Sequence, residues 1–346
     1  MFTVETEDNE VTVGILDSIY DPGDEFRNYN TVGRTFDVID SGVDGTCGHG
    51  YKIIDILAGF TDNPEYQFFQ VVNESGKSRD SYLMKAIGLA MEYGEVDVLN
   101  LSVGADHVSD EDRDCTEAIS QCALCEVAEE AIDQGITIVA SSGNHPHVES
   151  VCCPSLSSLV ISVGGAVTKC TASIDGYNYQ TSNGGFPPNA IWVQREDERS
   201  SEVPLCSNRG CIPGESCSEN QNTEPWRHNV EFTDRKPDIL APSHWVWKSE
   251  ERGPVIDQGT SFSTPLVTAG IVVTLDWARR DGWDISSQQI REAIRSSGHN
   301  FSDIDRRYFS QEKFTNELRR LLGLEPEPII DAVGGPVDML GNNSEF

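Results

Sequence analysis

The stretch GTSFSTP at residues 259–265 places one serine where a Gly-Thr turn enters an apolar helix, expected over residues 262–280. A serine at a helix start has the positive end of the helix dipole and backbone N–H groups beside it, and both would stabilise an oxyanion formed during acyl transfer. Serine and threonine are also common N-caps. Ser261 is therefore a candidate nucleophile, with helix capping as the alternative.

A serine nucleophile needs a base that takes its proton and an acid that orients the base. Asp17 follows the mostly apolar run 11–16, which has the pattern of a buried parallel strand, and ligands bind at the carboxyl ends of such strands. His49 lies between two glycines at the start of a helix expected over residues 49–59. Taken singly, Asp17 could form a turn and His49 could be a structural histidine.

Together these segments resemble the subtilisin-like serine proteases, the subtilases, over about residues 11 to 280. VGILDS at 13–18 is similar to the aspartate segment of the family, GHG at 48–50 to its histidine segment, and GTSFSTP to its serine segment, in the same order. ITIVASSGN at 136–144 is similar to the segment with the oxyanion-hole asparagine, which would be Asn144.

The resemblance implies a serine endopeptidase that acts on protein or peptide substrates through an acyl-enzyme. Asp17 would orient His49, His49 would activate Ser261, and Asn144 would hold the oxyanion. A maturation protease or transpeptidase dedicated to one target would use the same residues. A non-catalytic peptide-binding module is the alternative from another functional class.

The resemblance also implies two walls of a substrate-binding site. Segment 97–104 is similar to the strand with which an extended substrate pairs, and segment 140–143 to the opposite wall of the specificity pocket. The candidate substrate-binding residues are Leu101, Ser102, Val103, Gly104, Ser141, Ser142 and Gly143. KPDILAP at 236–242 and CSNRG at 206–210 match family segments that we interpret as structural.

Two positions near His49 depart from the family pattern. Tyr51 stands where the family usually has threonine, which predicts a change in pocket shape, and Asp55 stands where it usually has a small residue. We interpret Asp55 as a packing change or an ion pair. Neither departure removes a member of the triad.

The order of elements predicts an α/β fold, a three-layer subtilisin-like arrangement with a mostly parallel central sheet and helices on both faces. A catalytic domain is expected over residues 1–324, interrupted by an insertion at about 171–230, with an acidic Pro/Gly-rich tail at 325–346. Strands are expected near 11–16, 68–73, 97–102, 136–140 and 159–163, and the remaining helices near 80–93, 115–134, 286–297 and 309–322.

The chain is strongly acidic, with 57 Asp and Glu against 25 Lys and Arg and a net charge of −32. The acidic residues are scattered through the sequence, which fits a protein adapted to high salt, where screening relieves self-repulsion. An equal melting temperature at low and at molar salt would contradict this hypothesis. The charge argues against a nucleic-acid partner.

The first residues contain no basic region followed by an apolar stretch, so no secretory signal is expected. We therefore expect a cytoplasmic protein, or a secreted one if the sequence is a mature or truncated form. No apolar run approaches the roughly 20 residues of a membrane helix, so no membrane association is expected. The sequence does not predict an oligomeric state.

Three of the ten cysteines, Cys115, Cys122 and Cys125, fall with Ala118 and Ala128 on one stripe of the helix expected at 115–134. A buried apolar face is the plainest interpretation. A metal site and bonding to cysteines elsewhere remain alternatives.

The sequence does not contain a pair of Cys-x-x-Cys motifs, the arrangement that would indicate zinc strongly, so no metal ligand is predicted. The chemistry implied by the resemblance requires no cofactor. Structural calcium is frequent among subtilases, but the sequence assigns it to no residues.

Overall fold

The computed structural model describes fifteen segments of the chain. They are 11–18, 32–40, 48–61, 64–73, 76–93, 95–105, 122–144, 151–166, 171–174, 177–181, 191–195, 202–203, 236–247, 255–301 and 304–327.

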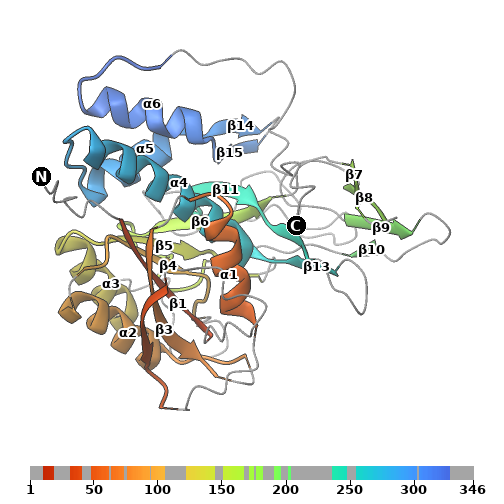
Figure 1. The fold of residues 1–346 in the computed structure, drawn as a ribbon, viewed down its shortest axis with the longest axis horizontal. Helices are drawn as coiled ribbons and strands as arrows, with labels where there is room; N and C mark the ends of the chain where they lie inside the picture. Colours follow the sequence, from red (N-terminus) through yellow and green to blue (C-terminus); the bar gives the residue numbers. More distant parts are fainter. Residues whose placement is uncertain are drawn as a thin grey trace, which may run out of the picture.

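The centre of the fold is a nine-stranded sheet with the order β14-β15-β11-β6-β5-β4-β1-β3-β2 (Figure 1). Neighbouring strands in it are parallel, except for the antiparallel pair β14 and β15. The strands are β1 (Thr12–Ser18), β2 (Val32–Asp37), β3 (Glu65–Val72), β4 (Val98–Leu101), β5 (Thr137–Ser141), β6 (Ile161–Ala166), β11 (Ile239–Pro242), β14 (His299–Phe301) and β15 (Ile304–Tyr308).

The register of the central strands brings three loops to one edge of the sheet. Leu16 of β1 pairs with Leu101 of β4, and Leu101 pairs with Ala140 of β5. Because these strands are parallel, Asp17, Ser102 and Ser141 follow at the same carboxyl edge, which is where ligands bind in open α/β sheets.

Helices cover both faces of the sheet, as Figure 1 shows. One hydrophobic cluster holds residues of α1 (His49–Ala58), α4 (Thr260–Arg280), α5 (Ser287–Ser297) and α6 (Gln311–Leu321). The other holds residues of α2 (Asp80–Tyr93) and α3 (Ala123–Asp133). The predicted three-layer arrangement is therefore confirmed.

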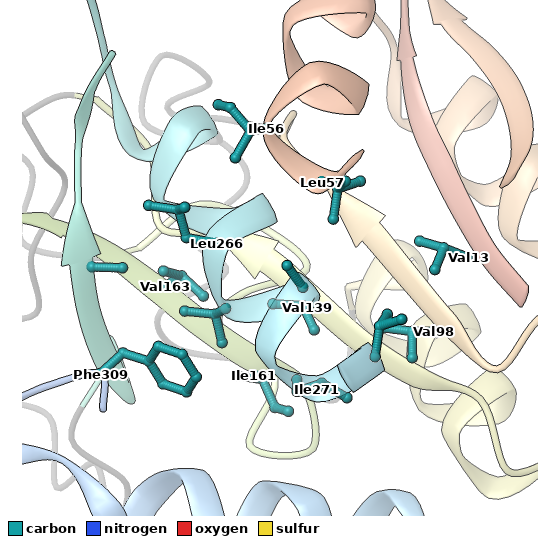
Figure 2. Close-up of a cluster of buried hydrophobic side chains, with 14 of the residues drawn as sticks. Val13, Ile56, Leu57, Val98, Val139, Ile161, Val163, Leu266, Ile271 and Phe309 are labelled. Atoms are coloured by element: carbon teal, nitrogen blue, oxygen red, sulfur yellow. The ribbon is translucent and has the colours of Figure 1, made fainter. Parts of the chain in front are cut away.

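The strands β1, β4 and β5 alternate their buried side chains between these two cores, whereas Ile161 and Val163 of β6 belong to the core under α1 and α4. In Figure 2, Val13, Val98, Val139 and Val163 point toward Leu57 of α1 and toward Leu266 and Ile271 of α4. Leu16 of β1, Leu99 of β4 and Ala140 of β5 point the other way and belong to the core under α2 and α3. Burial on both faces explains why these strands read as continuous apolar runs.

The insertion expected at about 171–230 contains strands that the sequence analysis did not predict. They form an antiparallel sheet with the order β10-β9-β8-β7, built from β7 (Thr171–Ile174), β8 (Tyr177–Thr181), β9 (Ile191–Arg195) and β10 (Glu202–Val203). A further hairpin, β12 (His244–Trp247) with β13 (Val255–Gln258), leads into α4. CSNRG at 206–210 lies outside the described residues, as does the tail beyond Glu327.

Within the described segments, no helix has both the length and the apolar character needed to cross a membrane.

Candidate active site

Asp17 is fully buried at the carboxyl end of β1. The pairing of β1 with β3 shifts register between Asp17 and Ser18, so the strand becomes irregular where the acid is placed. One carboxylate oxygen, Oδ1, accepts a hydrogen bond from the backbone N–H of Ser18 at 2.7 Å. This bond holds the carboxylate at the sheet edge.

His49 is the first residue of α1 and meets Asp17 directly. Its Nδ1 lies 2.8 Å from Asp17 Oδ1 and 2.9 Å from Oδ2, while its side chain is 29% exposed. An ionised carboxylate only accepts hydrogen bonds, so Nδ1 carries the proton. In a neutral imidazole with that tautomer, Nε2 has the lone pair that a general base needs.

Close packing of α1 against β1 brings these two side chains together. The Gly50 N–H donates to Ser18 Oγ at 2.8 Å. A Cβ atom on Gly50 would lie 2.4 Å from the Ser18 carbonyl oxygen, so any larger residue would force the helix away from the strand. The glycine after His49 is therefore required by the approach of the helix to β1.

Helix α4 begins at Thr260 with Gly259 as its N-cap and no side-chain cap of its own. Asn144, an exposed residue in the loop after β5, supplies the missing acceptor. Its Oδ1 accepts from the Thr260 backbone N–H at 2.8 Å and from Thr260 Oγ1 at 3.1 Å. The N–H can only donate, so this contact identifies Oδ1 and leaves Nδ2 as the donor side of the amide.

Ser261 is the second residue of α4 and is half-buried. Its hydroxyl donates to the Ser102 carbonyl at 2.7 Å, and the Ser102 hydroxyl donates back to the Ser261 carbonyl at 2.9 Å. Pro265 explains the second bond: it has no N–H, so the carbonyl four residues earlier lacks its helical partner. The reciprocal pair fastens the end of β4 to the start of α4.

A buried polar chain supports this connection. The Thr268 hydroxyl donates to Asn100 Oδ1 at 2.9 Å, and Asn100 Nδ2 donates to Ser102 Oγ at 3.0 Å. All three side chains are buried, and each bond satisfies groups that would otherwise be costly to bury. The position of Ser261 relative to β4 is therefore well defined.

Comparison with known proteins identifies the family of the chain. The model of the subtilase family matches residues 8–317. The chain belongs to the subtilase family. It is thus a peptidase of a family of serine proteases, as the sequence analysis predicted. No curated protein matches the sequence.

Solved structures similar to this subtilase share its fold at low sequence identity. The prenylagaramide maturation protease PagA is 19% identical with a TM-score of 0.55, covering 90% of this chain and 94% of that one. A lanthipeptide protease is 19% identical with a TM-score of 0.57, covering 90% and 87%. A cold-adapted subtilisin-like serine proteinase is 18% identical with a TM-score of 0.52, covering 87% and 88%.

The candidate substrate-binding residues of the subtilase differ in accessibility. Leu101, Ser102, Ser141 and Ser142 are buried, whereas Val103 and Gly143 are half-buried and Gly104 is exposed. The Ser141 carbonyl already accepts from the Cys152 thiol and the Ser155 hydroxyl, at 3.1 and 2.7 Å. Of these candidates, only Val103, Gly104 and Gly143 are therefore accessible to a bound molecule.

The two departures near His49 lie on the described part of α1. Tyr51 is half-buried and packs against the core cluster shared by α1 and α4. Asp55 is half-buried one turn further along. The phenyl ring of Phe262, the residue after Ser261, lies 5.7 Å from the His49 ring, so α1 and α4 meet at His49.

KPDILAP at 236–242 contains a buried ion-pair network. Lys236 Nζ lies 2.7 Å from Asp238 Oδ2, and Arg295 Nε of α5 lies 2.8 Å from Asp238 Oδ1. Lys236 also donates to the Val160 carbonyl at 2.6 Å. These contacts join the start of β11 to α5 and to the segment before β6.

The expected helix at 115–134 is corrected by the structure. Helix α3 begins at Ala123, and Cys122 is its N-cap, so Cys122 does not share a helical stripe with Cys125. Cys125 and Ala128 are buried in the helix as expected, whereas Cys115 and Ala118 lie outside the described residues. The thiol contacts of Cys153 with Cys122 and then Cys125, together with burial, raise the pKa of Cys153 above its ordinary value.

Sequence reasoning missed three supporting roles. Ser18 binds Gly50, Thr260 binds Asn144, and Ser102 binds Ser261. Of these, only the last had a signal in the sequence, because Pro265 in the first turns of α4 leaves a carbonyl for an outside donor.

Proposed function

We propose that this subtilase is a serine endopeptidase that cleaves peptide bonds through Asp17, His49 and Ser261. The observation that supports the proposal best is the contact of His49 Nδ1 with both oxygens of buried Asp17, at 2.8 and 2.9 Å. A base held in this tautomer and backed by a carboxylate is what serine activation requires.

In the proposed reaction the Ser261 hydroxyl turns from the Ser102 carbonyl toward His49 Nε2. Nε2 takes the hydroxyl proton while Oγ forms a bond to the scissile carbonyl carbon. His49 then gives this proton to the leaving amine as the C–N bond breaks. Water attacks the acyl-enzyme with His49 again as the base, and Ser261 is released with its proton restored.

The oxyanion of the tetrahedral intermediate would accept hydrogen bonds from Asn144 Nδ2 and the Ser261 backbone N–H. Support comes from Asn144 Oδ1, which is engaged by Thr260 and so fixes which side of the amide donates. The N–H lies in the first turn of α4, where the helix dipole also favours negative charge.

An extended peptide is the proposed substrate. It would lie against Val103 and Gly104, the accessible residues of the segment that follows β4, with Gly143 on the opposite side. Backbone pairing alone selects for an extended chain and little for sequence.

A dedicated maturation protease or transpeptidase is the second candidate. PagA is named as a maturation protease, and the lanthipeptide protease is named for a lanthipeptide. The cold-adapted subtilisin-like proteinase is about as similar to this chain, so the distinction must come from products. A transpeptidase would yield a product joined to an added amine, whereas a hydrolase yields a free carboxylate.

A fluorophosphonate probe tests the proposal, because it forms a stable bond only with an activated serine. We expect the wild-type chain to be labelled and Ser261→Ala to be unlabelled, with both proteins folded by circular dichroism. Absence of labelling in folded wild type at both low and molar salt would instead favour a peptide-binding module.

A further inference from the structure

Three cysteines from two separate segments meet beneath the substrate-binding loops. Cys122 and Cys125 lie at the start of α3, and Cys153 lies in the segment after the Asn144 loop. Their Sγ atoms are all within 4.8 Å of one another, and those of Cys122 and Cys153 are 3.4 Å apart. All three side chains are buried, and no disulfide joins them.

We infer that Cys122, Cys125 and Cys153 are the protein ligands of a zinc ion. With Zn–S bonds of about 2.3 Å, the sulfurs of a tetrahedral site stand roughly 3.8 Å apart. A disulfide requires about 2.05 Å between two sulfurs and leaves the third thiol without a role. Three sulfurs at mutual distances up to 4.8 Å therefore fit a shared ion better than a bonded pair.

The chemistry of the donor set selects the metal. Thiolates bind soft or borderline ions such as zinc, whereas calcium and magnesium prefer oxygen. Cys122 and Cys125 form a Cys-x-x-Cys unit, which is the spacing of the first ligand pair in many zinc sites. With three thiolates bound, a water molecule completes the tetrahedron.

Binding needs no redox step. Three Zn–S bonds form, and the three thiol protons leave to solvent. The resulting thiolate charge faces the start of α3, where backbone N–H groups and the helix dipole favour negative charge. Cys122 is the N-cap and makes no side-chain capping bond, so metal ligation would not compete with capping.

The position of the cluster gives the ion a structural task. The backbone of Cys153 pairs with Ala105 through two hydrogen bonds of 3.0 and 3.1 Å, directly after the substrate segment that ends at Gly104. The adjacent Cys152 thiol donates to the Ser141 carbonyl of the opposite wall at 3.1 Å. An ion at the cluster would therefore tie α3 to both sides of the proposed substrate site.

The segment that ends at Gly104 packs closely against the cysteine segment. A Cβ atom on Gly104 would lie 2.3 Å from Cys152 Sγ, so the substrate segment rests directly on the cysteine segment. Metal binding itself is independent of the proposed catalysis. Only its effect on substrate binding depends on that proposal.

Metal analysis of the full chain tests the inference. We expect about one zinc per chain after purification under reductant, and cobalt(II) in its place should give a sulfur-to-metal charge-transfer absorption. Cys125→Ser and Cys153→Ser should lose the metal and the absorption. Cys152→Ser is the matched control, because it removes a neighbouring buried thiol that lies outside the cluster, and it should keep both.

Other outcomes would overturn the inference. These are a folded, reduced wild type that binds neither zinc nor cobalt, a native disulfide between Cys122 and Cys153 by mass spectrometry, and equal metal loss in Cys152→Ser. If the cysteine variants fail to fold, titration of the wild type with cobalt still decides. Metal retained in Ser261→Ala separates this site from any failure of the proposed catalysis.

Discussion

The two helices that carry proposed catalytic residues, α1 and α4, begin differently from the two C-terminal helices, α5 and α6. Helices α1 and α4 start after glycine N-caps, Gly48 and Gly259, that provide no side-chain bond. Helices α5 and α6 start after Ser286 and Ser310, whose hydroxyls accept N–H groups of their own helices.

The difference lies in where the first N–H groups of each helix find their partners. Ser286 and Gln289 form a local capping box within four residues. At α1 and α4, the acceptors are Ser18 and Asn144, from strands and loops far away in the sequence. A local cap satisfies the first N–H groups of a helix within the helix itself. At α1 and α4, acceptors that are distant in sequence satisfy them and so fix the helix start to the sheet edge where the chemistry is proposed.

The largest expected effect is at the start of α1. Asp17→Asn should lower the rate of labelling by a fluorophosphonate about 10⁴-fold, because an amide no longer enforces the Nδ1–H tautomer of His49. The second-order rate constant for labelling measures this loss. A rate within tenfold of wild type, in a folded variant, would show that the Asp17 contact is structural only.

At the start of α4, two variants of Asn144 separate its two tasks. Asn144→Asp keeps an acceptor for the Thr260 N–H but has no donor, whereas Asn144→Ala loses both. Both should reduce the labelling rate about 10²–10³-fold. Only the alanine variant should also lose a cap, at about 1 kcal/mol of unfolding free energy.

Labelling rates and thermal unfolding measured on the same samples decide between these tasks. If Asn144→Asp labels as fast as wild type, the amide is a cap without a part in oxyanion binding.

The smallest effect is expected at α5. Ser286→Ala removes a local cap and should cost about 1 kcal/mol of unfolding free energy, with the labelling rate unchanged. Denaturant unfolding and the labelling rate provide the two readouts. A fall in the labelling rate comparable to that of the Asn144 variants would mean that loss of any cap disturbs the site, and the contrast between the two kinds of helix start would not hold.

The sequence by itself determined the family and the layered α/β arrangement. The family could be predicted because the segments around Asp17, His49 and Ser261 are contiguous motifs. The layers could be predicted because apolar runs alternate with segments of helical periodicity, the pattern of a parallel sheet that is buried on both faces. The strands inside residues 171–203 escaped prediction, because short antiparallel strands between Gly, Pro and Asn have neither long apolar runs nor helical periodicity.

Only the tertiary structure decided which distant groups meet. Thr260 and Asn144 are 116 residues apart, and Ser102 and Ser261 are 159 apart. The start of α3 at Ala123 likewise placed Cys122 against Cys153, where the sequence had suggested a stripe along one helix. Side-chain periodicity predicts which face of an element is buried, but strand order and register choose its partners, and those depend on the whole chain.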